Sequence, residues 1–206
     1  MGIVFALEGR SLPAAYFVWI ACLFDFLDGF ATRILKVSSP IGKELDSLAD
    51  MVSFGLLPSV VVYKMLVAAG APEYIPYLAF SIAVFSALRL AIFNLDERQA
   101  DSFRGLPTPA NALLITALPL LTGDVATLLQ VYWVLCLIIV FSSYLLVSGI
   151  ELFALKFKNF SWQENKIRFT FLMLSVLLLA TLQLAAIPVI ILLYIALSLG
   201  VRAVSK

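Results

Sequence analysis

The sequence contains no histidine and only two cysteines, Cys22 and Cys136, in 206 residues. The absence of histidine excludes Ser-His-Asp catalysis, Cys-His catalysis and any zinc site with histidine ligands. Both cysteines lie in apolar runs, so they provide neither a disulfide framework nor the paired spacing of a metal site. Any chemistry performed by this chain must therefore use carboxylates, amides, hydroxyls, lysine and arginine.

Charged residues are also scarce. They make up 13% of the chain, whereas hydrophobic residues make up 63% and the mean hydropathy is +1.05. A soluble domain is about half apolar and about a quarter charged, so folding in water would leave a large apolar surface exposed. We therefore expect an integral membrane protein. The formal net charge of +1 gives no strong attraction for a polyanion, so nucleic acid is not expected as a partner.

Long apolar runs predict an all-α, polytopic bundle of transmembrane helices, because a bilayer core about 30 Å thick needs roughly 20 apolar residues per helix. The predicted spans are about Leu12–Leu35, Ile41–Val67, Ile75–Phe93, Leu106–Leu121 and Leu128–Ile150. Met1–Leu7 is too short to span, and we expect it to be the end of a helix whose beginning is absent. Residues 1–150 are thus expected to form a transmembrane core with a truncated first helix.

Residues 151–206 are expected to form an interfacial segment followed by a transmembrane hairpin. Glu151–Arg168 is basic and aromatic, which is typical of a segment that lies along the membrane surface. Phe169–Val201 is long for one helix and has basic residues at both ends, which favours a hairpin that turns near Gln183–Pro188. Most lysines and arginines fall on one side of the predicted spans, and that side is expected to be cytoplasmic.

Four aspartates interrupt the first two full spans. Asp25 and Asp28 lie in one of them, and Asp46 and Asp50 lie in the next. Ionisable residues inside spans are costly and are candidates for function. Spacings of three and four residues place each pair on one helix face, and the short Ile34–Ile41 connection makes the two helices antiparallel. The four carboxylates can therefore converge in one cavity.

Such a cluster must be neutralised by protons or by cations. Ligands that are all oxygen suit hard ions such as Mg²⁺, Mn²⁺ or Ca²⁺, and four carboxylates without histidine fit a two-metal site for phosphoryl chemistry. The simpler alternative is that one or two of them form interfacial salt bridges with Arg33, Lys36 or Lys43. Gly29 and Gly42 lie close to the aspartates in sequence, where glycine allows either tight helix packing or the approach of a ligand.

The segment from Asp25 to Asp50 resembles the signature of the CDP-alcohol phosphotransferases, D-x2-D-G-x2-A-R-x8-G-x3-D-x3-D. It matches at Asp25, Asp28, Gly29, Arg33, Gly42, Asp46 and Asp50, and it departs at Thr32, where the family usually has alanine. The flanking segments 39–58, 87–94 and 103–112 resemble the phosphatidylserine synthase branch of that family, except that Ile92 replaces a usual arginine. The resemblance covers about residues 1–150.

This resemblance implies the fold of the CDP-alcohol phosphotransferases and a role for each matching residue. Two divalent ions, Mg²⁺ or Mn²⁺, would be held by Asp25, Asp28, Asp46 and Asp50 and would bind the diphosphate of CDP-diacylglycerol. Gly29, Arg33 and Gly42 would line the CDP pocket, and Asp50 would be the general base. The implied reaction joins the phosphatidyl group to the hydroxyl of L-serine and releases CMP. It would take place at the cytoplasmic face of a bacterial cytoplasmic membrane, in a possible homodimer.

The carboxylate of serine requires an arginine or an equivalent hydrogen-bond donor. We predict Arg89 for this role, with Asn94 and Lys43 as weaker candidates. The alternative for Arg89 is a structural pair with an aspartate or with backbone carbonyls. A sibling enzyme would use glycerol 3-phosphate or inositol phosphate as the acceptor, but Ile92 leaves one basic residue fewer for a phosphate. A carboxylate-lined ion or proton transporter would explain the aspartates inside spans, but not the spacing of the glycines and the arginine.

Overall fold

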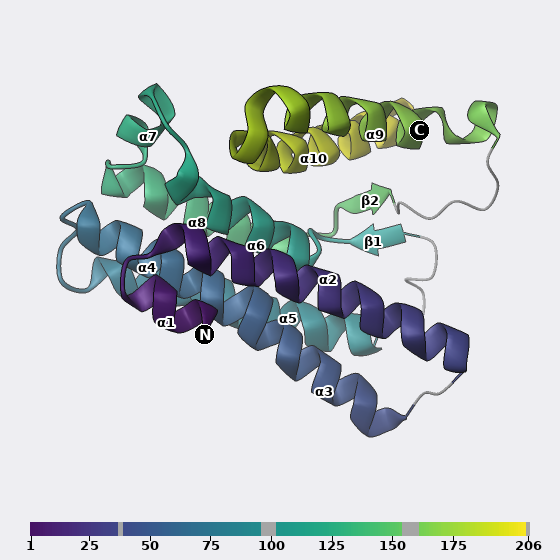
Figure 1. The fold of residues 1–206 in the computed structure, drawn as a ribbon, viewed down its shortest axis with the longest axis horizontal. Coiled ribbons are helices and arrows are strands. Elements are labelled where there is room, and N and C mark those ends of the chain that lie inside the picture. Colours follow the sequence, from purple (N-terminus) through teal and green to yellow (C-terminus); the bar gives the residue numbers. More distant parts are fainter. Residues whose placement is uncertain (37–38, 96–101, 154–160, 205–206) are drawn as a thin grey trace.

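The structure, a computed structural model, describes residues 1–36, 39–95, 102–153 and 161–204. These residues form a helical bundle with one two-stranded ribbon (Figure 1). The α-helices are α1 (Gly2–Leu7), α2 (Ser11–Leu35), α3 (Pro40–Asp50), α4 (Leu57–Ala68), α5 (Ser81–Leu95), α6 (Thr108–Ala117), α7 (Asp124–Leu128), α8 (Tyr132–Val147), α9 (Trp162–Leu182) and α10 (Ala186–Val204). Some of these helices are connected by a π-helical turn, η1 (Met51–Leu56), and by three 3-10 turns, η2 (Ile75–Phe80), η3 (Leu118–Leu120) and η4 (Gln183–Ala185). The two strands are β1 (Ser102–Arg104) and β2 (Glu151–Phe153). The prediction of an all-α bundle is confirmed, whereas the short ribbon was not predicted.

Four helical runs are long and apolar enough to cross a membrane. They are Ser11–Thr32, Pro40–Ala68, Ile75–Leu95 and Asn165–Gly200. Thr108–Leu120 and Tyr132–Val147 are shorter apolar helices. Large hydrophobic side chains are widely exposed on the bundle, as expected for a surface that contacts lipid.

The turn between α2 and α3 follows from local signals at its two ends. Helix α2 ends at Leu35 and is followed by its C-cap residue, Lys36, which has the left-handed φ of 51°. Helix α3 begins with Pro40 in its first turn, and the Ser39 hydroxyl accepts a hydrogen bond from the Gly42 N–H at 3.0 Å. The two helices consequently lie antiparallel, as predicted (Figure 1).

Helix α3 continues into α4 through the π-helical turn η1, which directly follows Asp50. Pro58 has no N–H to donate to the carbonyl of Phe54, so the regular α-helical ladder is interrupted there. Gly55 lies against α5, because a Cβ added at Gly55 would be 3.1 Å from the Cβ of Ser86. This close approach brings α5 against the turn that follows Asp50.

The main apolar core lies between α4, α5, η2 and α8, where Leu66, Ile82 and Ile139 are almost fully buried. A buried polar contact also links α6 to α8, since the Ser142 hydroxyl donates to the Asn111 side-chain oxygen at 2.6 Å. Hydrogen bonds of this kind join helices in an environment without water. The core and this contact hold the end of α8 close to α5 and α6.

The ribbon fastens the chain after α5 onto the end of α8. Strands β1 and β2 pair antiparallel, with Arg104 opposite Glu151. Gly105 follows β1 with a φ of 75°, and its N–H donates to the carbonyl of Ile150 at 2.9 Å. A Cβ at Gly105 would collide with the carbonyl oxygen of Leu146, so both the backbone angle and the space require glycine.

Helices α9 and α10 form an antiparallel hairpin above the rest of the bundle (Figure 1). The chain reverses at η4, where Gln183 has a φ of 50°. The predicted turn near Gln183–Pro188 is therefore confirmed.

The segment before this hairpin differs from the prediction. Helix α9 begins at Trp162, seven residues before the expected Phe169, and the Asn165 side chain bonds the Ser161 carbonyl in its first turn at 3.0 Å. The first residues of the predicted interfacial segment Glu151–Arg168 form β2. Residues 154–160 of that segment lie outside the described residues.

Candidate active site

Three of the four predicted aspartates meet between α2 and α3. One carboxylate oxygen from each of Asp25, Asp46 and Asp50 lies within 4.8 Å of the others. Asp25 comes from α2, and the other two lie one turn apart on α3. Asp25 and Asp50 are half-buried, whereas Asp46 is exposed. The prediction that carboxylates of the two helices converge is confirmed for these three residues.

No lysine or arginine side chain that the structure describes forms an ion pair with these aspartates, although Arg89 interacts electrostatically with Asp50. The two ion pairs formed by the described side chains lie elsewhere, at Arg10–Glu8 and Arg104–Glu151. The Lys43 ammonium donates to a backbone carbonyl instead of a carboxylate. Three carboxylates gathered without a paired cation have the donor chemistry of a site for a hard divalent ion, because only oxygen ligands are present.

The other residues of the motif occupy the same two helices. Asp28 is exposed on α2, three residues after Asp25, but it is not part of the three-carboxylate group. The Gly29 carbonyl accepts a hydrogen bond from the Thr32 hydroxyl at 3.2 Å, and the Gly42 N–H is used to cap α3. The side chain of Arg33 lies outside the described residues. The roles predicted for Asp28, Gly29, Arg33 and Gly42 therefore stay predictions.

Arg89 is buried beside the aspartates. Its side chain lies on α5, which packs on the turn that follows Asp50, and only 7% of the residue is exposed. The guanidinium interacts electrostatically with the carboxylate of Asp50 and lies 5.7 Å from the ring centre of Phe93. Its Nε is buried and has no hydrogen-bond partner among the described groups. A buried donor without a partner is costly, so this atom is suited to receive an anionic ligand.

Lys43 and Asn94 form a clamp between α3 and α5. The Lys43 ammonium donates to the Asn94 backbone carbonyl at 2.8 Å, and the Asn94 side-chain amide donates to the Ser47 hydroxyl at 2.8 Å. Sequence reasoning did not identify Ser47, although it directly follows Asp46 and lies one turn after Lys43. The structure thus brings together Lys43 and Asn94, the two residues predicted beside Arg89 as contacts to the serine carboxylate.

A pocket of about 210 Å³ opens beside Arg89. It is lined by Arg89, Ile92, Phe93, Arg104, Leu146, Val147, Ser148 and Gly149. Neither Arg104 nor Ser148 was predicted from the sequence as a site residue, although Arg104 lies in the segment 103–112 that resembles the phosphatidylserine synthase branch. The only feature of Arg104 visible in the sequence is that it precedes a glycine. Arg104 comes close to Arg89 only because the ribbon and α8 bring the two segments together.

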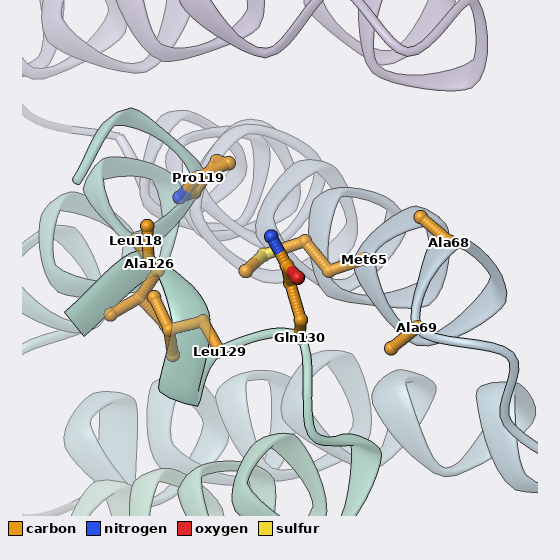
Figure 2. A pocket seen from close by; sticks show the side chains of 8 residues that line it. All are labelled: Met65, Ala68, Ala69, Leu118, Pro119, Ala126, Leu129 and Gln130. Carbon is orange, nitrogen blue, oxygen red and sulfur yellow. The ribbon is translucent and has the colours of Figure 1, made fainter. Parts of the chain in front are cut away.

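A second pocket, of about 330 Å³, carries no comparable chemistry. Figure 2 shows its lining, in which Gln130 is the single polar side chain among Met65, Ala68, Ala69, Leu118, Pro119, Ala126 and Leu129. Met65 lies 15 residues beyond Asp50 on the same helical run, which corresponds to roughly 22 Å along the helix. This pocket is therefore separate from the aspartate cluster.

The fold and the motif define a membrane-embedded transferase family. Residues 1–138 match the CDP-alcohol phosphatidyltransferase family, and the matched region includes all four aspartates, so the chain belongs to this family. Together with four apolar helices of membrane-spanning length, this membership identifies an integral membrane protein.

Several curated relatives of this chain carry the same name. A CDP-diacylglycerol–serine O-phosphatidyltransferase of Mycobacterium leprae is 36% identical over 158 residues, which is 72% of this chain and 51% of the relative. The protein of the same name from Bacillus subtilis is 36% identical over 106 residues, 51% of this chain and 59% of the relative. An archaetidylserine synthase of Methanothermobacter thermautotrophicus is 32% identical over 155 residues, 73% of this chain and 62% of the relative. The chain thus spans about half to three fifths of the length of these relatives.

Proposed function

We propose that this protein transfers the phosphatidyl group of CDP-diacylglycerol to the hydroxyl of L-serine, which yields phosphatidylserine and CMP. The observation that carries the proposal is the meeting of Asp25, Asp46 and Asp50 within 4.8 Å, at positions that match the family motif. The names of the relatives support serine as the acceptor. Family membership alone leaves the choice of alcohol open.

The carboxylates account for the binding of the donor. Two divalent ions, Mg²⁺ or Mn²⁺, held by Asp25, Asp28, Asp46 and Asp50, would neutralise the oxygens of the diphosphate. Gly29, Arg33 and Gly42 lie on the same two helices and are the proposed contacts to the CDP moiety. The acyl chains remain in the bilayer, since this part of the bundle exposes apolar side chains such as Phe26 and Leu45.

Asp50 is the proposed general base. A serine hydroxyl is a weak nucleophile, so a carboxylate within hydrogen-bond reach must accept its proton. The hydroxyl oxygen then forms a bond to the phosphatidyl phosphorus, the bond from this phosphorus to CMP breaks, and the proton passes to Asp50. Arg89 is the proposed contact that orients the acceptor. The support for this role is that its buried guanidinium interacts electrostatically with Asp50 and that its Nε has no hydrogen-bond partner among the described groups.

The orientation follows from the distribution of charge. Most lysines and arginines of the sequence fall on one side of the predicted spans, at the end of the bundle where α2 ends and α3 begins. We propose that this end faces the cytoplasm, as in a bacterial cytoplasmic membrane, where soluble serine can enter. A homodimer is compatible with the exposed apolar faces of α2 and α3.

Membranes that contain the protein, incubated with CDP-diacylglycerol, Mn²⁺ or Mg²⁺ and labelled serine, test this function. We expect labelled phosphatidylserine and an equal amount of CMP. CMP release with glycerol 3-phosphate or inositol phosphate, but not with serine, would identify a sibling enzyme. If no alcohol supports CMP release, the enzymatic proposal fails, and ion flux through vesicles containing the protein would then test the transporter alternative.

A further inference from the structure

Resting on the proposed function, we infer that Arg89 and Arg104 together bind the anionic group of the acceptor in the pocket beside Arg89. We further infer that Glu151, paired with Arg104, lowers the positive charge of this pocket so that a carboxylate is preferred to a phosphate. Glu151 would thereby be a residue that determines acceptor specificity.

The first support is the state of Arg89. The residue is 7% exposed, and its Nε has no hydrogen-bond partner among the described groups. A buried cation with an unused donor is stabilised strongly by an anion that completes its hydrogen bonds. Its guanidinium also interacts electrostatically with the carboxylate of Asp50, the proposed base. Arg89 also lines the pocket, so an anion other than the Asp50 carboxylate would bind to it there.

The pocket itself suits a small molecule. Its volume is about 210 Å³, which is smaller than the roughly 300–1,000 Å³ typical of pockets for drug-sized ligands. Ile92, Phe93 and Val147 form apolar walls, while Ser148 and Gly149 add polar backbone and hydroxyl groups. A free amino acid fits these dimensions, and the acyl chains of a lipid do not.

The second arginine is placed by the ribbon. Arg104 is the last residue of β1. The Gly105 N–H that follows it donates to the carbonyl of Ile150, just before β2, and the Leu106 N–H donates to the carbonyl of Leu145 in α8. Because a side chain at Gly105 would collide with Leu146, the backbone beside Arg104 has little freedom to shift. Arg104 consequently borders the same pocket as Arg89, although the two arginines come from different elements.

Glu151 then sets the charge of the pocket. The β-register places it opposite Arg104, with the guanidinium and the carboxylate 3.9 Å apart and both about half exposed. The carboxylate of Glu151 offsets the charge of Arg104 and so makes the pocket less positive. A phosphate monoester carries close to two negative charges at neutral pH, so Glu151 repels it more strongly than it repels a carboxylate, which carries a single negative charge. Repulsion of the wrong ligand is an effective source of specificity.

The test compares Glu151→Gln with a matched control, Glu8→Gln. Glu8 forms a similar half-exposed ion pair with Arg10, at 3.6 Å, but in the turn between α1 and α2. Thermal unfolding of each purified full-length variant would be followed at increasing serine, inorganic phosphate or glycerol 3-phosphate. Divalent cations are omitted, so that phosphate cannot bind through a metal.

We expect Glu151→Gln to lower the concentration of phosphate that gives half-maximal stabilisation by roughly threefold to tenfold, while the control behaves like the wild type. A merely structural role of Glu151 would weaken the binding of every ligand and would not strengthen that of phosphate. Equal phosphate responses in Glu151→Gln and Glu8→Gln would overturn the inference. If Glu151→Gln does not fold, Arg104→Gln provides the second test. In that variant we expect the serine concentration that gives half-maximal stabilisation to rise by roughly threefold to tenfold. An unchanged serine response in that variant would likewise overturn the inference.

This result is separable from that of the proposed function. The unfolding measurement needs neither CDP-diacylglycerol nor turnover, so it is decisive even if the wild type releases no CMP with serine. If serine supports turnover while Glu151→Gln leaves phosphate binding unchanged, the proposed function stands and the role of Glu151 is excluded.

Discussion

The Lys43 ammonium donates a hydrogen bond to the backbone carbonyl of Asn94 at 2.8 Å and thereby joins α3 to the end of α5. Both residues were predicted to contact serine, and both are now engaged with each other and with Ser47. The clamp holds the helix that carries Asp46 and Asp50 against the helix that carries Arg89. Lys43 and Asn94 thus connect the helix of the proposed base, Asp50, to the helix of Arg89, which is the proposed contact to the acceptor.

Replacing Asp50 by asparagine should abolish turnover. The change keeps the shape of the side chain but removes the carboxylate proposed to accept the proton of the serine hydroxyl, and a general base contributes about 10²–10⁴-fold to rate. We expect CMP release to fall by at least that factor, while CDP-diacylglycerol still binds. CMP release and binding of the labelled lipid would be measured on the same membranes. Asp124→Asn, at the start of α7, is the control, and near-normal turnover in Asp50→Asn would remove Asp50 as the base.

Removal of divalent ions should stop the reaction reversibly. Asp25, Asp46 and Asp50 lie within 4.8 Å of one another without a paired cation among the described side chains, so a chelator should leave the diphosphate of the donor without its counter-charge. We expect CMP release to fall by more than about 100-fold in a chelator and to recover with Mn²⁺ or Mg²⁺. Full activity in thoroughly chelated membranes would contradict the metal site.

Replacing Arg89 by glutamine should affect the acceptor more than the donor. The substitution removes the charge that is proposed to bind the serine carboxylate, and a hydrogen bond to a charged group contributes about 1.5–3 kcal/mol. The KM for serine should therefore rise by roughly tenfold to 100-fold, while the KM for CDP-diacylglycerol changes little. Steady-state kinetics with each substrate varied in turn provide the measurement. Arg10→Gln is the control, and an equal rise in both constants would show that Arg89 acts on the fold as a whole.

Two glycines with similar backbone angles allow the placement of the ribbon to be tested. Gly105 and Gly123 have φ values of 75° and 70°, but only Gly105 has neighbouring atoms where a Cβ would lie. Alanine at either position should cost about 1–2 kcal/mol for the left-handed conformation. At Gly105 the collision with Leu146 should add further destabilisation and displace Arg104 from the pocket. Thermal unfolding and the KM for serine would be compared, and equal behaviour of Gly105→Ala and Gly123→Ala would exclude a special role for the close approach.

The sequence by itself determined the long apolar helices α2, α3 with α4, and η2 with α5, and the antiparallel course of α2 and α3. Hydropathy depends only on local composition, and Ser39 and Pro40 mark the start of α3 whatever the rest of the chain does. Spacings of three and four residues likewise place Asp25 with Asp28, and Asp46 with Asp50, on shared helix faces. These features were predictable because each depends on neighbours in sequence.

The tertiary structure alone decided which of these side chains meet. It grouped Asp25 with Asp46 and Asp50 and left Asp28 outside the group, since the distance between carboxylates depends on how α2 lies against α3. It also brought Arg104 to the pocket of Arg89 through a ribbon that pairs residues 102–104 with residues 151–153. Three-residue strands have too little pattern to be recognised in a sequence, because their stability comes from the partner strand and from the end of α8.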